Sequence, residues 1–319
     1  MKRTITTLSV AAGLLLAAPV AIAADTFVRM VSGPAGGSWY PLGAKMMQVF
    51  QRDIPGISTA LAPGGGVGNI MDVSNGEAEI GWSYGHTAYN GLKGRGKFDH
   101  PYKNVAFFAT LYPGIVQTAV PRNSSIKSFY DFKGKNISPG KSKWTGTAFA
   151  ETVLKAYDLD FAKIRASGGT VHHVDYNDSK ALMKDGHIDV FLAVTSMPQA
   201  SFIDLNFKPG IKFIGIDQDK MKGIIADNPG TYATVIPKGT YEGMTADVPT
   251  LATATVMVVR ADLPADLVYK MCKVFWKEHA TFAAVKKTWN NVKLKDALKA
   301  AAIPVHPGAA RCYKELGVS

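Results

Sequence analysis

The chain has 319 residues, of which 47% are apolar and 19% are charged, a balance that excludes disordered and fibrous classes. The length is sufficient for two domains, each with its own core. The formal net charge is +11, but the lysines are scattered and no basic run is interleaved with aromatic residues, so the sequence does not predict a nucleic-acid groove.

The N-terminus has the pattern of a secretory signal. Lys2 and Arg3 precede a short apolar run, Val10–Ala18, and Ala21-Ile22-Ala23 supplies the small residues of a cleavage site. We therefore expect residues 1–23 to be a cleaved signal peptide and the protein to work in the periplasm. No later stretch approaches the ~20 apolar residues of a membrane helix.

Strands and helices are predicted to alternate along the chain. The expected strands are Thr26–Val31, Ile57–Ala62, Glu79–Ser83, Asn136–Ser138, Val171–Val174, Ile188–Val194 and Ile211–Ile214. Between them, helical spacing places helices around Leu42–Phe50, Asn69–Ser74, Ala148–Tyr157, Ser179–Lys184 and Gln199–Asp204, with another beginning near Gly85. Repeated strand–helix units predict an α/β fold with mostly parallel sheets flanked by helices.

Two long apolar, β-favouring runs, Val105–Val120 and Leu251–Val259, are expected to be strands that cross between two lobes. They predict a first lobe built from residues 24–118 and 250–319, and a second lobe built from residues 119–249. From Pro264 onward the chain is expected to be helical. Cys272 and Cys312 either form one disulfide that pins the last helix or are two separate buried thiols, and spacing alone does not decide.

One short pattern suggests an enzyme. Gly81-Trp82-Ser83-Tyr84-Gly85 matches G-x-S-x-G at a strand-to-helix junction, as in a nucleophile elbow, and His306 follows later in the chain. An HGGG-like oxyanion loop is missing from the sequence, so a serine hydrolase is the alternative and non-enzymatic binding is the prediction. His172 and His173 are adjacent and would point to opposite faces of a strand, and no Walker A or G-x-G-x-x-G motif occurs, so neither metal nor cofactor is expected.

Four loops of small residues each follow a predicted strand and precede a predicted helix. They are Gly36–Tyr40, Gly64–Asn69, Ser83–Tyr84 and Lys141–Thr147. Ligands of open α/β sheets bind at the carboxyl ends of strands, where helix N-termini present free N–H groups that suit carboxylates. The sequence therefore predicts a site for a small carboxylate. Lys141 and Lys143 either assist its binding or are solvated lysines of the loop.

These loops resemble the TAXI-type solute receptors of tripartite (TRAP) transporters. Gly33–Gly43 is similar to that family's glycine-rich start, Phe132–Gly140 to its "L-K-G-K-x-V-S-x-G" block, and Ile303–Ala309 to its "I-P-L-H-P-G-A" ending. Gly66–Trp82, Lys184–Asp189 and Gly230–Arg260 match further blocks in the same order. The resemblance implies a two-lobed periplasmic-binding-protein fold that closes about a hinge, acts as a monomer and delivers its ligand to TRAP membrane subunits.

Carried onto this chain, the resemblance and the loops together give the expected ligand contacts. These are Gly37, Ser38, Trp39, Tyr40, Gly66, Asn69, Ser83, Tyr112, Ser142, Lys143, Trp144, Thr145, Gly146 and Thr147. Members of the family are associated with glutamate, 2-oxoglutarate and related dicarboxylates. The four loops contain no acid to pair with an ammonium group, which favours a dicarboxylate or keto acid such as 2-oxoglutarate over glutamate. A sensory binding protein that signals without transport is the remaining alternative.

Overall fold

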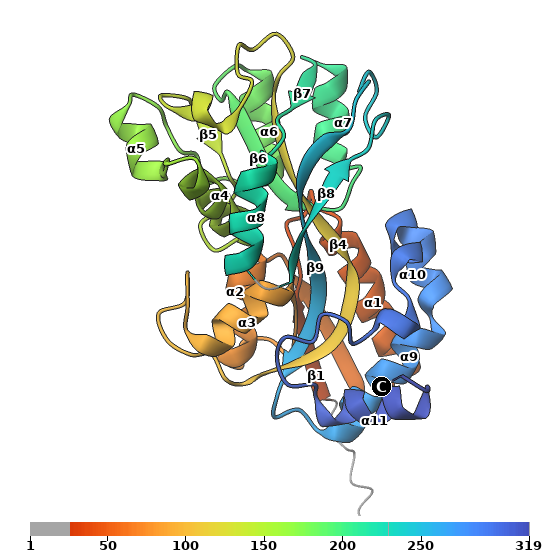
Figure 1. Cartoon of the computed structure of the whole chain (residues 1–319). Helices are drawn as coiled ribbons and strands as arrows, with labels where there is room; N and C mark the ends of the chain where they lie inside the picture. The colour runs from red at the N-terminus through yellow and green to blue at the C-terminus, as the bar shows by residue number, and fades with distance from the viewer. Residues whose placement is uncertain (1–25, 229, 319) are drawn as a thin grey trace, which may run out of the picture.

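The computed structural model describes residues 26–228 and 230–318, so the predicted signal peptide, residues 1–23, lies outside the described residues. The described chain forms one nine-stranded sheet with the order β2-β1-β3-β9-β4-β6-β5, to which β7 adds at β4 and β8 adds at β9. Figure 1 shows two halves, a lower and an upper one, that share this sheet through β4 (Val105–Pro121) and β9 (Val248–Arg260). No helix within the described ranges is long and apolar enough to cross a membrane.

The lower half contains both ends of the described chain (Figure 1). Its elements are β1 (Thr26–Val31), α1 (Trp39–Asp53), β2 (Ile57–Ala62), α2 (Gly66–Ser74), β3 (Ile80–Tyr84), α3 (Gly85–Lys93), α9 (Ala265–Lys277), α10 (His279–Val285), the 3₁₀ turns η2 (Lys287–Asn291) and η3 (Leu294–Asp296), and α11 (Pro307–Glu315). The upper half is formed by the middle of the chain. Its elements are η1 (Phe129–Phe132), β5 (Ile137–Ser138), α4 (Thr145–Ala156), α5 (Phe161–Ala166), α6 (Tyr176–Lys184), β6 (Val190–Thr195), α7 (Ala200–Phe207), β7 (Ile211–Phe213), α8 (Gln218–Asp227) and β8 (Thr231–Ile236).

The α/β fold predicted from the strand–helix alternation is confirmed, but the sheet is mixed rather than mostly parallel. β1 pairs in parallel with β2 and β3, and β5 pairs in parallel with β6. The pairings of β3 with β9, β4 with β9, β4 with β6, β4 with β7 and β8 with β9 are antiparallel. The reason is that β4 runs from the lower half to the upper while β9 returns, so the two central strands have opposite directions.

β4 and β9 pair along both halves of the molecule. Their register runs from Val105 opposite Arg260 to Ile115 opposite Ala252, and it shifts between Thr110 and Pro113. This shift falls at the Tyr112-Pro113-Gly114 interruption of the apolar run, because proline removes a ladder N–H. The crossover is therefore a two-stranded ribbon with an irregularity near its middle.

The two cysteines form a disulfide. Cys272 of α9 and Cys312 of α11 are both fully buried and are bonded to each other, with their Cα atoms 6.3 Å apart. The bridge fixes the last helix of the lower half to α9. This settles the alternative that spacing left open.

One expected strand does not form. Val171 makes only an isolated bridge to Ile137, and the chain then turns at Asp175, whose carboxylate accepts the N–H groups of Asn177 and Asp178 at the start of α6. The segment Val171–Val174 thus contributes one isolated bridge, and the helix that follows begins three residues before the expected Ser179. The pattern also missed β8, α5 and α8.

Candidate functional site

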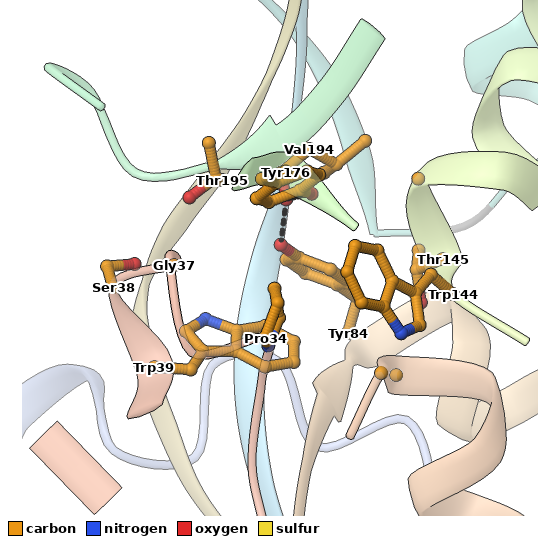
Figure 2. Close-up of a pocket in the computed structure, with 13 residues that line it drawn as sticks. Pro34, Gly37, Ser38, Trp39, Tyr84, Trp144, Thr145, Tyr176, Val194 and Thr195 are labelled. Atoms are coloured by element: carbon orange, nitrogen blue, oxygen red, sulfur yellow. Dashed lines mark hydrogen bonds between the residues drawn. The ribbon is translucent and has the colours of Figure 1, made fainter. Parts of the chain in front are cut away.

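A cavity of about 30 Å³ lies between the two halves, at the ends of several strands (Figure 2). The lower half contributes to its wall Pro34, Gly37, Ser38, Trp39, Gly65, Gly66 and Tyr84, and the upper half contributes Trp144, Thr145, Gly146, Tyr176, Val194 and Thr195. None of these described lining residues carries a formal charge. The cavity is thus an uncharged interlobe site.

Four helices begin at this cavity. Trp39 is the first residue of α1, Gly66 of α2 and Thr145 of α4, while Tyr84 is the N-cap of α3. None of the four N-caps makes a side-chain cap hydrogen bond. The first-turn N–H groups of a helix have no intrahelical acceptor, and each N-terminus carries a partial positive charge of about half a unit. The cavity therefore has a positive potential without a charged side chain.

Hydroxyl groups add further donors. Thr195 is 4% exposed, and its hydroxyl makes no hydrogen bond to any residue in the described part of the chain. The Ser38 oxygen accepts from the Tyr112 hydroxyl at 3.2 Å, which leaves the Ser38 proton free to donate. Buried hydroxyls normally have partners, so these two are available to a ligand.

Aromatic rings form much of the remaining wall. The ring centroids of Trp39 and Tyr84 lie 5.0 Å apart, and those of Trp144 and Tyr176 lie 5.1 Å apart. The hydroxyls of Tyr84 and Tyr176 both donate to the Val194 carbonyl, at 2.9 and 3.3 Å, and Figure 2 shows the first of these bonds. Burial raises the pKa of both phenols, so each keeps its proton for this bond. Since Tyr84 belongs to the lower half and Val194 to the upper, the Tyr84 bond joins the halves.

The close approach of the halves depends on glycine at position 65. A Cβ atom there would lie 1.8 Å from Cδ1 of Trp144. Gly65 has φ −166°, an extended conformation that any residue can adopt. Glycine is therefore required there because a side chain would clash with Trp144, and not because of backbone strain.

The structure brings together half of the predicted contacts. Gly37, Ser38, Trp39, Gly66, Trp144, Thr145 and Gly146 line the cavity, whereas Tyr40, Asn69, Ser83, Tyr112, Ser142, Lys143 and Thr147 do not. Two of the residues that do not line the cavity form hydrogen bonds to residues that do. The side-chain oxygen of Asn69 accepts the Gly65 N–H at 2.9 Å, and its side-chain nitrogen donates to the carbonyls of Ser32 and Trp82, each at 2.6 Å. The Tyr112 hydroxyl donates to the Ser38 hydroxyl.

Lys141 and Lys143, which were considered as groups that assist the ligand, do not line this cavity. Lys141 lies 3.7 Å from the carboxylate of Asp175 and over the Trp144 ring, and Lys143 is exposed, with its carbonyl accepting the Gly68 N–H at 3.0 Å. Both lie outside the cavity because Trp144 turns inward as the helix begins. Likewise, the Thr147 hydroxyl points back to the carbonyls of Gly140 and Lys141, where it closes its own loop.

Sequence reasoning missed Pro34, Tyr176, Val194 and Thr195 as lining residues, whereas Gly65 and Tyr84 lie in two of the predicted binding loops. Val194 and Thr195 end β6, so the rule that ligands bind at the carboxyl ends of strands applied to them as well. The same rule applied to Tyr176, which follows the strand expected at Val171–Val174, although that strand does not form and Tyr176 is the first residue of α6.

Among the described residues, Ser83 lacks the arrangement that a serine nucleophile needs. Ser83 is fully buried, and its hydroxyl donates to the Gly66 carbonyl at 2.8 Å. Within the described ranges no histidine nitrogen is hydrogen-bonded to it. His306 instead caps α11 by accepting the Gly308 N–H at 3.1 Å and contacts the Leu263 carbonyl. Nor do the described residues gather three His, Cys, Asp or Glu side chains into a possible metal site.

Comparison with known families agrees with this architecture. Residues 30–317 match the model of the NMT1-like family. The protein belongs to the NMT1-like family. The fold of this NMT1-like protein is similar to that of a structure from a study of glutathione import via GshT and the cystine ABC importer TcyBC of Streptococcus mutans, with a TM-score of 0.50 and 12% identity over 84% of this chain and 96% of that one.

A second solved structure to which this chain is similar is that of the periplasmic aliphatic sulphonate binding protein SsuA of Escherichia coli. Its TM-score is 0.46 at 12% identity, over 90% of the NMT1-like chain and 78% of SsuA. At such identities the likeness to the Streptococcus structure shows a shared fold and nothing about the ligand.

Proposed function

We propose that this protein is a periplasmic solute receptor that captures a small organic anion between its two halves and delivers it to a membrane transporter. The observation that carries the proposal is the uncharged interlobe cavity at which α1, α2, α3 and α4 all begin. A site that both halves complete is suited to a ligand that holds them together.

Charge decides between an anion and a cation. Aromatic faces such as those of Trp39 and Trp144 attract cations by about 0.5–2 kcal/mol. Each helix N-terminus favours an anion by about 0.3–1 kcal/mol, and by up to ~2 kcal/mol where it is partly buried. The four termini and the four rings of the cavity act with energies of similar size, so the balance rests on the free hydroxyls of Ser38 and Thr195, which donate to an anion. Since no acid lines the cavity, an ammonium group would have no partner.

The ligand class that follows is a keto acid or a dicarboxylate such as 2-oxoglutarate, bound more tightly than glutamate. A volume of about 30 Å³ holds about two water molecules. A five-carbon ligand therefore requires the halves to stand further apart than they do here, whereas a smaller keto acid requires less movement.

Calorimetric titration tests the ligand class. Pyruvate, succinate, 2-oxoglutarate and glutamate are titrated into the wild type, into Thr195→Val and into Thr118→Val. Thr118 is a matched control, because its hydroxyl is also buried without a partner but lies on β4 away from the cavity. Loss of a hydrogen bond to a carboxylate should cost Thr195→Val about tenfold or more in affinity and leave Thr118→Val unchanged. Tightest binding of glutamate, or equal effects of the two variants, would refute this ligand class.

The type of transporter is the finer part of the proposal. The motif blocks Gly33–Gly43 and Ile303–Ala309 support a TRAP partner. Uptake of the identified ligand should then require the TRAP membrane subunits and an ion gradient, and should not require ATP hydrolysis. ATP-dependent uptake would assign an ABC partner, and binding without any uptake would favour the sensory alternative.

A further inference from the structure

A second and much larger cavity lies between the halves. Its volume is about 240 Å³, and it shares no lining residue with the first. The lower half contributes Val67, His86, Thr87, Asn90, Arg95, Gly96, Lys97 and Phe98, and the upper half contributes Ala148, Phe149, Glu151, Thr152, Lys155 and Asn228. Nothing in the proposed function uses it.

The charge of this cavity is strongly basic. Arg95, Lys97 and Lys155 face a single lining acid, Glu151, which is paired with Lys97 at 2.5 Å. Within residues 26–228 and 230–318, neither Arg95 nor Lys155 forms an ion pair. Two cationic groups, one from each half, thus line one hollow with no described acid within ion-pair distance of either, although Asp219 and Asp227 lie with Lys155 around an adjacent hollow.

The inner wall between the two cavities is a hydrogen-bonded row of polar side chains. His86 is 6% exposed, with Nδ1 2.9 Å from the Thr253 hydroxyl and Nε2 3.1 Å from the Thr87 hydroxyl. The Thr87 hydroxyl in turn lies 3.3 Å from that of Thr145, which lines the first cavity. Because these groups are satisfied by one another, the charged groups at the outer side carry the recognition in the second cavity.

We propose that this second cavity binds a small dianionic oxyacid, through Arg95 of the lower half and Lys155 of the upper half. A guanidinium presents paired N–H groups that match carboxylate and phosphate oxygens, and an ammonium adds a mobile point charge. The oxygens of one phosphate, or the two carboxylates of a dicarboxylate, bind Arg95 and Lys155 together. An anion held in this way bridges the halves, so it favours the closed arrangement and raises the affinity of the first cavity for its own ligand.

The test uses inorganic phosphate and succinate as separate probes in calorimetric titrations near pH 7.5, with the full-length mature protein. Saturable binding is expected for at least one probe, and each of Arg95→Gln and Lys155→Gln should weaken it about tenfold. Saturation by phosphate alone identifies a phosphate-type ligand, and saturation by succinate with weak phosphate binding identifies a dicarboxylate.

The controls separate the two cavities. Lys270→Gln removes the same charge from an exposed position on α9 and should leave probe binding unchanged. Thr195→Val, in the first cavity, should leave phosphate binding unchanged. For succinate, which the first cavity can also take, it should remove only the part of the binding that does not depend on Arg95. If the probe is lost in Thr195→Val and kept in Arg95→Gln, it occupies the first cavity. The second site is then refuted while the solute-receptor function stands. Absence of saturable binding of either probe also overturns the second site.

Discussion

The ammonium of Lys97 lies 2.5 Å from the carboxylate of Glu151, and this ion pair joins the lower half to α4 of the upper half. The two side chains are 35% and 27% exposed, so the pair is worth roughly 0.2–1 kcal/mol. Because its two members belong to different halves, the pair would break if the halves moved apart.

Glu151→Gln should therefore weaken binding in the first cavity by about two- to fivefold, because the closed arrangement loses that stabilisation. Titration of the identified ligand at low and high salt measures the effect, and the wild type should approach the variant at high salt. The control is Lys184→Gln, which breaks a pair with Asp204 at 2.7 Å inside the upper half. An equal loss in both variants would contradict a role in closure.

Replacing Gly65 by alanine should hold the halves apart. The added Cβ would lie 1.8 Å from Trp144, in a backbone conformation that alanine adopts freely. We expect at least a tenfold loss of ligand affinity and a larger radius of gyration in small-angle scattering with ligand present. Gly223→Ala, where a Cβ has nothing within 4 Å, should behave as the wild type. Unchanged compaction of Gly65→Ala by ligand would count against closure at this contact.

The stability of the protein should fall in mild acid because of His86. Burial lowers the pKa of His86 to about 4, below the ~6.5 of the unfolded chain. The unfolded chain then binds the proton more tightly than the folded one. The contribution of neutral His86 to the free energy of unfolding is therefore intact above pH ~6.5 and declines as the pH falls toward 4.

Between pH 7.5 and pH 5, the free energy of unfolding should fall about 2 kcal/mol further in the wild type than in His86→Gln. Denaturant titrations at the two pH values measure this difference. His187→Gln, at an exposed position, should keep the wild-type dependence. Parallel pH profiles for wild type and His86→Gln would show that His86 is not the cause.

Loss of the Cys272–Cys312 disulfide should destabilise the lower half. The bridge closes a chain separation of 40 residues, which corresponds to about 4 kcal/mol in the chain-entropy model. We expect the double variant Cys272→Ser/Cys312→Ser to lose 2–4 kcal/mol of unfolding free energy, measured by denaturant titration. Reduction of the wild type should give a similar loss and leave the double variant unaffected. No effect of reductant on the wild type would contradict the bridge.

Most of the strands, and several of the loops that line the cavity, were predictable because their signals are local. β1 and β2 begin and end at the residues expected from the sequence, since each is a β-favouring run bounded by turn residues. The antiparallel direction of β9 relative to β3 depends on pairs such as Ile80 and Val259, which are far apart in the sequence. A local sequence pattern therefore does not predict this direction. The site divides in the same way: Ser38 and Thr145 follow from loop composition, whereas Tyr176 reaches the cavity only through the packing of the upper half.

The place of β9 in the sheet also determines when the protein can fold. β9 lies between β3 and β4, yet residues 248–260 come after the whole upper half in the chain. Until they are available, β3 and β4 each lack their shared neighbour and present open edges that invite pairing with other chains. The lower half therefore completes its sheet late, through contacts distant in sequence, which slows folding. A chain that ends before Val248 would hold most of the residues of both halves and still aggregate rather than fold.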